Sequence, residues 1–335
     1  MPLSSLSTIL PAPLLRDPLF LVALFVAGSL LMLWRLERLS QSGLDGTVIG
    51  TLIMPYCSGI GNLVFVFEAN REGLPGSEVV VNALVNNVTN MTLLLGVPAV
   101  LWGSRLPRQR ANRKRKAATE QRLHRLSIFL TLLAVLFFTG AAWALGADGA
   151  FTRNDGLVLI GLFLFWQCFQ VYDVLKTNAR EQRSLSWWLT LDFLLLLLGA
   201  LDVYLAVSGL VEWIGSAEGR YLSRTNAGWL SGWLMVLPNA LLALYYGWRR
   251  KPEVVYTSQI GDGHICIPLG IGLATLLGDV TTPAMFQTSI LILSGAVVVH
   301  FAVVSLFGQL PRAVGILLIL LYVHFVRAGL LAGQM

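Results

Sequence analysis

The stretch VNALVNNVTNMTLLLG (residues 81–96) places four asparagines inside an apolar run long enough to cross a lipid bilayer. A side-chain amide costs free energy in hydrocarbon unless a hydrogen-bond partner or an ion pairs with it. On an α-helix, Asn82, Asn86 and Asn90 form one polar stripe at i, i+4 and i+8, and Asn87 flanks it. Two interpretations are open. The amides hold neighbouring helices together, or their carbonyl oxygens bind a cation such as Na⁺, Ca²⁺ or Mg²⁺. Four on one helix favour a site for an ion or a polar substrate.

The composition excludes an ordinary soluble domain. Of 335 residues, 56% are hydrophobic and 13% are charged, whereas soluble domains contain roughly 25% charged residues. Apolar runs of the length that a bilayer crossing requires alternate with short polar loops. We therefore expect an all-α membrane protein embedded in the lipid bilayer. Its ten transmembrane helices are expected near residues 18–36, 47–68, 79–102, 127–146, 155–175, 187–213, 226–248, 254–278, 286–307 and 312–332.

The net charge of +6 comes from basic residues in the loops. Ten spans put both termini on one side of the membrane, and 18 of the 24 Lys and Arg residues then fall in the loops of the other side. By the positive-inside rule that other side is the cytoplasm, so both termini are expected outside it. Basic residues in this arrangement report orientation, so no nucleic-acid partner is expected. The absence of targeting features beyond the spans fits a bacterial inner membrane.

The basic segment RLPRQRANRKRKAATEQRLHR (105–125) is the longest polar interruption of the chain. It is interpreted as a cytoplasmic orientation anchor that also attracts anionic lipid headgroups. A regulatory or nucleic-acid role is the alternative that the segment leaves open.

Several chemistries are not supported by the sequence. Cys57, Cys168 and Cys266 all fall within predicted spans, so neither a disulfide framework nor a zinc site is indicated. An intramembrane hydrolase would need a catalytic pair, and Asp202 and Asp262 lie on different spans without such a motif. No phosphate-binding G-x-x-x-x-G-K-[ST] loop occurs. We therefore expect no enzyme activity and no cofactor, and any transport would run on an ion gradient.

An internal repeat relates the two halves of the chain. SGIGNLVFVF (58–67) precedes NALVNNVTNMTLLLG (82–96), and MVLPNALLAL (235–244) precedes QIGDGHICIPLGIG (259–272). The same offset in residue number relates Asn62 to Asn239 and Asn82 to Gln259, so the polar positions are equally spaced in both units. Five spans per repeat give the second copy the opposite orientation in the membrane. Such a 5+5 inverted repeat is typical of secondary transporters, which bind their substrates near the membrane midplane.

The expected organisation follows from the spans and the repeat. Residues 1–103 hold the first three helices, with the first repeat unit at 47–102, and residues 104–126 form the basic cytoplasmic loop. Helices four and five occupy 127–176. The second five-helix half occupies 185–335, with its repeat unit at 226–278. The sequence sets no oligomeric state.

The repeat units resemble those of the calcium/cation antiporter superfamily, which includes sodium/calcium exchangers and cation/proton exchangers. NALVNNVTNMTLLLG is similar to the family stretch GNVVGSNIFNLLLVLG, and Asn82, Asn87, Asn90 and Gly96 match it in register. Upstream, the family pattern GTSLPEL corresponds to SGIGNLV (58–64) and to MVLPNAL (235–241). The resemblance implies the sodium/calcium exchanger fold and secondary cation antiport. It also implies alternating access by the first and sixth helices sliding over the core.

The departures from the family pattern lie at the charged positions. The two family glutamates correspond to Asn62 and Asn239, and Asp262 is the only carboxylate within the core of the second repeat. Because Ca²⁺ affinity depends on the number of charged ligands, the ion selectivity is expected to differ from Na⁺/Ca²⁺ exchange. A monovalent cation, or weaker divalent transport coupled to Na⁺ or H⁺, fits the neutral residues. The alternative is a transport-inactive scaffold or sensor with the same fold.

Two sets of site residues are expected. The cation-binding residues expected are Asn62, Asn82, Asn86, Asn87, Asn90, Asn239 and Asp262, of which Asn62, Asn90, Asn239 and Asp262 are the metal ligands for the transported ion. Helices two and seven are expected to break near Gly59, Gly61 and Pro238 and to present backbone carbonyls, and Ser58 and Gly263 are further backbone positions of the site.

Overall fold

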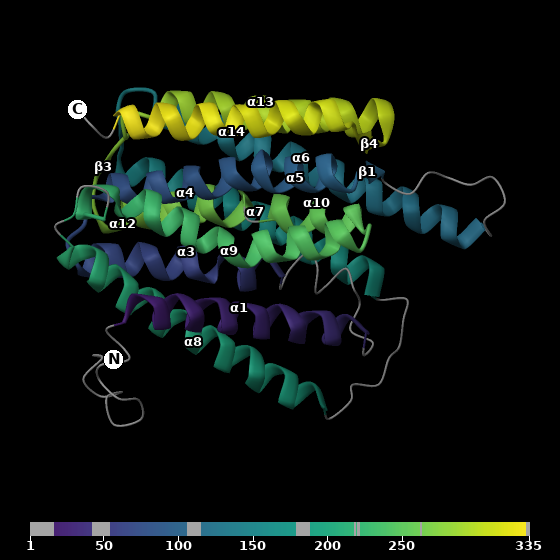
Figure 1. Cartoon of the computed structure of the whole chain (residues 1–335), viewed down its shortest axis with the longest axis horizontal. Coiled ribbons are helices and arrows are strands. Elements are labelled where there is room, and N and C mark those ends of the chain that lie inside the picture. Colours follow the sequence, from purple (N-terminus) through teal and green to yellow (C-terminus); the bar gives the residue numbers. More distant parts are fainter. Residues whose placement is uncertain are drawn as a thin grey trace.

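The computed structural model describes residues 17–41, 54–105, 115–178, 188–217, 219, 222–261 and 263–332. Long helices run side by side in one bundle, and α1 and α8 lie along one flank of it (Figure 1). The elements of the first half are α1 (Pro18–Gln41), α3 (Met54–Arg71), α4 (Gly76–Met91), α5 (Leu93–Leu101), β1 (Ser104–Arg105), α6 (Arg115–Leu145), β2 (Ala150–Phe151) and α7 (Arg153–Asn178).

The second half repeats this order of elements after α8 (Trp188–Ser216). It continues with the 3₁₀ turn η4 (Arg224–Asn226), α9 (Ala227–Trp248), α10 (Pro252–Gly261), α11 (Gly263–Ile265), the π-helical η5 (Cys266–Ile271), α12 (Gly272–Leu277), β3 (Val280–Thr281), α13 (Phe286–Phe307), β4 (Gln309–Leu310) and α14 (Arg312–Ala332).

The helices match the predicted spans, except that α6 begins at Arg115, within the predicted basic loop. Within the described residues, nine helical segments are long and apolar enough to cross a membrane. The remaining predicted span, 47–68, corresponds to α3, whose first described residue is Met54. Large apolar side chains such as Phe165 and Leu306 are 75% and 76% exposed. An apolar exterior of this kind is what a lipid-embedded bundle requires.

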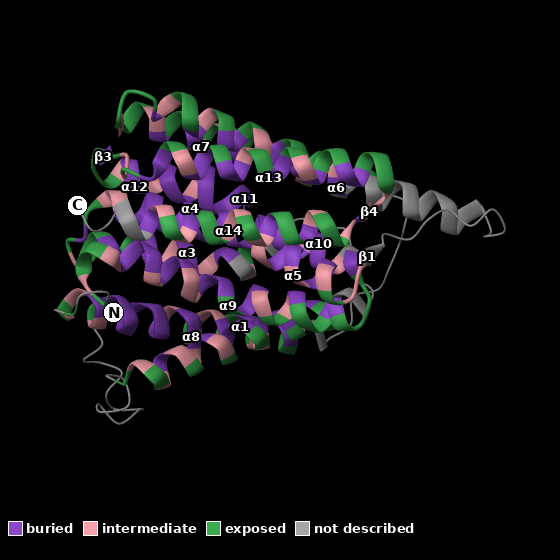
Figure 2. Ribbon diagram, turned by 45° about the horizontal axis from the view of Figure 1, so that its top comes forward, coloured by how far each residue is buried: buried purple, intermediate pink, exposed green. Residues whose placement is uncertain are grey.

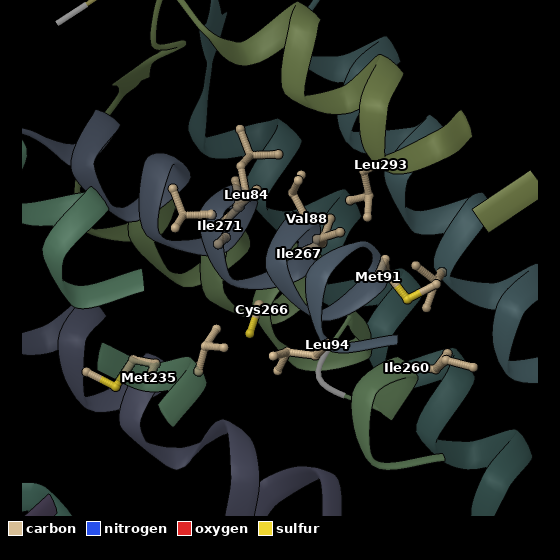
Figure 3. Packing of buried hydrophobic residues seen from close by; sticks show 14 of the residues in the cluster. Leu84, Val88, Met91, Leu94, Met235, Ile260, Cys266, Ile267, Ile271 and Leu293 are labelled. Carbon is tan, nitrogen blue, oxygen red and sulfur yellow. The ribbon is translucent and has the colours of Figure 1, made fainter. Parts of the chain in front are cut away.

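The polar stripe of the sequence lies at the centre of the bundle. In α4 every residue from Glu78 to Met91 is buried, whereas α14 is exposed along much of its length (Figure 2). Leu84, Val88 and Met91 of α4 belong to the same core cluster as Ile267 and Ile271 of η5 (Figure 3). The four asparagines of α4 therefore face protein on all sides and not lipid.

Two short β-ribbons display the inverted repeat. β1, which follows the α4–α5 span, pairs antiparallel with β4, which follows α13. At the opposite end of the bundle, β3, which follows α12, pairs antiparallel with β2, which follows α6 (Figure 1). Each ribbon thus joins the third helix of one repeat to the fourth helix of the other. The two ribbons lie at opposite ends because the repeats run in opposite directions.

Helices α3 and α9 do not break where the sequence predicted, whereas Gly263, also predicted as a break, is the first residue of α11. Helix α3 continues through Gly59 and Gly61, and α9 continues through Pro238. The interruptions occur one helix later in each repeat, at Thr92 between α4 and α5 and in the π-helical segment η5. Glycine and proline lower the cost of a break. An unbroken helix still keeps more backbone groups hydrogen-bonded in a bundle that lacks water.

Candidate functional site

Three of the predicted asparagines form a hydrogen-bonded row across two helices of the first repeat. Asn90 Nδ2 donates to Asn86 Oδ1 at 2.8 Å, and Asn86 Nδ2 donates to Asn62 Oδ1 at 3.1 Å. None of the three is more than 2% exposed. We call this row, Asn62–Asn86–Asn90, the amide ladder. It joins α3 to α4, as the helix-contact interpretation of the asparagine stripe requires.

The ladder has an unused donor at one end. Asn62 Nδ2 is buried and has no hydrogen-bond partner among the described residues. A buried polar atom without a partner costs about 1–3 kcal/mol. The ladder can therefore accept one more polar partner at Asn62 Nδ2. Alternatively, all three amides could flip, which would reverse the direction of every hydrogen bond in the row.

The other two asparagines of α4 lie in different contacts. Asn82 Nδ2 donates to Ser231 Oγ of α9 at 2.9 Å, and the Ser231 hydroxyl donates to the carbonyl of Gly228. Asn87 Nδ2 donates to the Ala83 carbonyl within its own helix at 2.7 Å. Its Oδ1 would lie 3.1 Å from a Cβ added to Gly263. Asn82 thus bridges the two repeats, and Asn87 faces the start of α11.

In the second repeat the equivalent residues are connected through the backbone. Gln259 Nε2 donates to the main-chain carbonyl of Asn239 at 3.3 Å and to Ser258 Oγ at 2.9 Å. Both Gln259 and Asn239 are buried, and Gln259 Oε1 accepts no hydrogen bond from the described residues. Helix α10 packs against α3 and α4. Among the described residues, this buried carbonyl oxygen is a second polar atom without a hydrogen-bond partner.

Part of the predicted site falls outside what the structure describes. Asp262 lies outside the described residues, as does the side chain of Ser58. The glycines of α3 serve helix packing: a Cβ on Gly59 would lie 3.0 Å from Ile265, and one on Gly61 would lie 2.5 Å from Met235 Sδ. Pro238 is buried inside α9.

The described part of the site is electrically neutral. Within the residues that the structure describes, no three His, Cys, Asp or Glu side chains gather closely enough to hold a metal ion. The ladder offers only amide groups, which are hard oxygen ligands without charge. These uncharged groups could attract a cation only through their dipoles.

Sequence reasoning missed three polar contacts that connect the repeat units to other helices. The carboxylate of Glu78 accepts a 2.6 Å hydrogen bond from the Gly228 backbone amide at the start of α9. Ser231 meets Asn82, and His300 of α13 meets the Met91 carbonyl at 2.7 Å. A signal was present in each case, because these are polar residues within predicted spans or at their ends. Their partners are distant in sequence and could not be named.

Comparisons with known proteins agree with this architecture. Residues 19–172 match the family described as "Sodium/calcium exchanger protein". No curated protein sequence matches the chain.

Solved structures of the sodium-calcium exchanger NCX_Mj share the fold. One, soaked with 2.5 mM Na⁺ and 10 mM Sr²⁺, has a TM-score of 0.67 at 18% identity and covers 92% of this chain and 95% of that one. Another, soaked with 100 mM Na⁺ and 10 mM Sr²⁺, has a TM-score of 0.67 at 19% identity and covers 94% and 98%. A third, with neither Na⁺ nor Ca²⁺, has a TM-score of 0.62 at 19% identity and covers 92% and 99%.

These findings confirm the predicted all-α membrane fold of the sodium/calcium exchanger kind. The family match covers the first repeat unit and the helices around it, and the shared fold extends over the second. Residues 19–172 therefore resemble the sodium/calcium exchanger family, and the chain as a whole shares the membrane fold of a sodium-calcium exchanger.

Proposed function

We propose that the chain is a secondary active cation antiporter with altered ion selectivity, coupled to Na⁺ or H⁺. The observation that carries this proposal is the amide ladder. It buries three side-chain amides between α3 and α4 at the centre of an exchanger fold. A bundle that needed only helix contacts could bury apolar residues there at lower cost. The ladder and the unmatched Gln259 oxygen are better explained by a site that receives a cation.

The neutral ladder determines which cation the site suits. In the structure, Oδ1 of Asn62 and of Asn86 each accepts an amide hydrogen. A cation would have to replace these hydrogen bonds by turning the amides, so its binding energy is offset by the bonds it breaks. Without a carboxylate to offset that cost, a divalent ion binds weakly. We therefore propose Na⁺ or another monovalent cation as the preferred ion, with Asp262 as the residue that takes a proton or completes the charge.

The membrane setting of the proposal follows the distribution of charge. We infer a bacterial inner membrane with both termini outside the cytoplasm, because the Lys and Arg residues crowd the loops on the side opposite to the termini. Ion gradients across such a membrane supply the driving force, since the sequence contains no phosphate-binding loop for a nucleotide.

The proposal is tested by ion flux in liposomes. The purified protein is reconstituted, and uptake of radioactive Na⁺ and Ca²⁺ is followed under imposed Na⁺ and proton gradients. The variants are Asp262→Asn and Asn86→Leu. The control is Thr139→Val, because Thr139 is also fully buried but its hydroxyl bonds within α6. We expect gradient-driven uptake in wild type and control and its loss in both site variants. If the folded protein carries no cation under any gradient, antiport is overturned. The result would then favour the alternative, a transport-inactive scaffold or sensor with the same fold.

A further inference from the structure

The interruption between α4 and α5 lies directly beside the amide ladder. Thr92 separates the two helices with φ −113° and ψ −72°, and both angles depart from those of a regular α-helix. The Thr92 hydroxyl donates to the Val88 carbonyl one turn back, a bond that often bends a helix. Asn90, the last member of the ladder, precedes this bend by two positions. The bend therefore sets the direction in which the end of the ladder points.

A histidine from another helix holds the main chain at this bend. His300 of α13 places Nε2 at 2.7 Å from the Met91 carbonyl oxygen, and both residues are at most 1% exposed. A carbonyl only accepts hydrogen bonds, so Nε2 must bear the hydrogen. In the neutral ring Nδ1 is then an acceptor. The hydroxyl of Tyr256 of α10 lies 3.2 Å from Nδ1 and donates to it.

This chain of contacts links three spans to a single peptide group. The hydroxyl of Tyr256 fixes the imidazole of His300, and the imidazole fixes the carbonyl of Met91, the residue after Asn90. Helix α13 belongs to neither of the two repeat units that contain the predicted site. A histidine that served only to join helices could bond to any side chain. His300 instead bonds to the backbone, one residue from the ladder.

The inverted repeat contains a corresponding contact. His264 of α11, in the interrupted span of the second repeat, has Nε2 at 3.4 Å from the Thr131 carbonyl of α6. Each interrupted span is thus tied by an imidazole to the fourth helix of the other repeat. The two β-ribbons follow the same pairing of elements. The His300 contact is the shorter of the two, and it alone ends at a carbonyl of the interrupted span.

We propose that His300 is a positioning residue for the cation site. It holds the Met91 carbonyl, and through it the bend at Thr92, so that Asn90 and Asn86 stay aligned with Asn62. The inference rests on the proposed transport function. It adds that the fourth helix of the second repeat controls the cation affinity of the first repeat's ladder without touching the ion.

The test compares substitutions that keep or remove the donor. His300→Gln keeps an N–H that can reach the Met91 carbonyl, because the glutamine amide nitrogen is as far from the backbone as Nε2. His300→Leu removes the donor, and His300→Asn places it too close to its own backbone to reach. Ser289→Ala is the control, since Ser289 is buried in the same helix and its hydroxyl donates to the nearby Met285 carbonyl.

Two measurements are made on each purified variant. The first is the concentration dependence of Na⁺ uptake in liposomes. We expect His300→Leu to raise the apparent KM about 10-fold, the usual effect of losing a residue that orients a ligand, with a smaller change in kcat. His300→Gln and Ser289→Ala should stay near wild type. The second is amide hydrogen exchange of residues 82–97 in detergent, with and without Na⁺. Na⁺ should slow this exchange in wild type and in His300→Gln, and less so in His300→Leu.

The outcomes separate this inference from the proposed function. Wild-type vesicles without cation flux overturn antiport, and the exchange measurement then decides on His300 by itself. Equal exchange and equal KM in His300→Leu and wild type overturn the positioning role while antiport stands. Should His300→Leu fail to fold, the pair His300→Gln and His300→Asn decides. A higher KM in His300→Asn than in His300→Gln supports the inference. Equal KM values in these two variants contradict it.

Discussion

The side-chain nitrogen of Asn86 lies 3.1 Å from Oδ1 of Asn62, so a neutral hydrogen bond joins two helices of the first repeat at the centre of an exchanger fold. In the superfamily pattern the Asn62 position is a glutamate, and a carboxylate there could not be satisfied by one amide alone. The neutral pair therefore lets the site close on itself without an ion. This relationship predicts how the protein responds when charge is restored.

Restoring the two carboxylates should create a calcium site. The double variant Asn62→Glu/Asn239→Glu adds two negative charges at buried positions. The amide ladder itself contains no charged residue. We expect the variant to be less stable than wild type without divalent ions, because unpaired buried charge is costly. Added Ca²⁺ should stabilise it by about 2.7 kcal/mol at a concentration about 100 times its Kd. Thermal unfolding against Ca²⁺ concentration measures this, and a Ca²⁺-independent midpoint would count against the site.

Glu78 should stabilise the start of α9. Its carboxylate accepts the Gly228 amide hydrogen at 2.6 Å, and Gly228 is the second residue of α9. An acceptor at a helix N-terminus contributes about 1 kcal/mol. We expect Glu78→Ala to lower stability by about 1–2 kcal/mol, and Glu78→Gln to lower it less. Chemical denaturation in detergent distinguishes them, and equal stability of the two variants would contradict a role for the acceptor.

The ion pair between α1 and α8 should be costly to break from one side. Arg35 Nη1 lies 3.2 Å from Asp192 Oδ1, with both side chains largely buried. Removing one partner leaves an uncompensated charge, at a cost of about 3–5 kcal/mol. We expect Asp192→Leu alone to be destabilised by about that amount and the double variant Arg35→Met/Asp192→Leu to be destabilised less. A double-mutant cycle measures the difference, and additive losses would show that the two groups do not interact.

Helices α1 and α8 should tolerate no added side chain at their crossing. A Cβ on Gly199 would lie 2.8 Å from the Gly28 carbonyl oxygen and 2.6 Å from Met32 Cγ. We expect Gly199→Ala to destabilise by about 1–3 kcal/mol, because the backbones must move apart. Gly161→Ala in α7 is the matched control, since nothing lies within 4 Å of its added Cβ. Thermal unfolding of both variants provides the test, and a neutral Gly199→Ala would mean that the helices separate freely.

The spans, the repeat and the contact between Asn86 and Asn90 could be predicted from the sequence alone. Hydropathy runs and the helical period are local properties, so they place most spans, such as α4, within a few residues of their observed ends, although α6 begins at Arg115 and not near 127. Asn86 and Asn90 are one helical turn apart, and their contact therefore follows from spacing. The constant offset between the two repeat units predicted Asn62 and Asn239 as equivalent positions. These inferences do not require knowing which helices are neighbours in space.

Which residues meet across helices, and where most of the helices break, depends on the packing of the whole bundle. The partners Asn82 and Ser231 are 149 residues apart, and Met91 and His300 are 209 apart. Nothing local selects such pairs. The breaks lie at Thr92 and in η5, and not at Gly59, Gly61 or Pro238. A helix within a bundle breaks where neighbouring helices supply new partners for the backbone. At Thr92 that partner is His300, a residue that the sequence of the repeat unit does not contain.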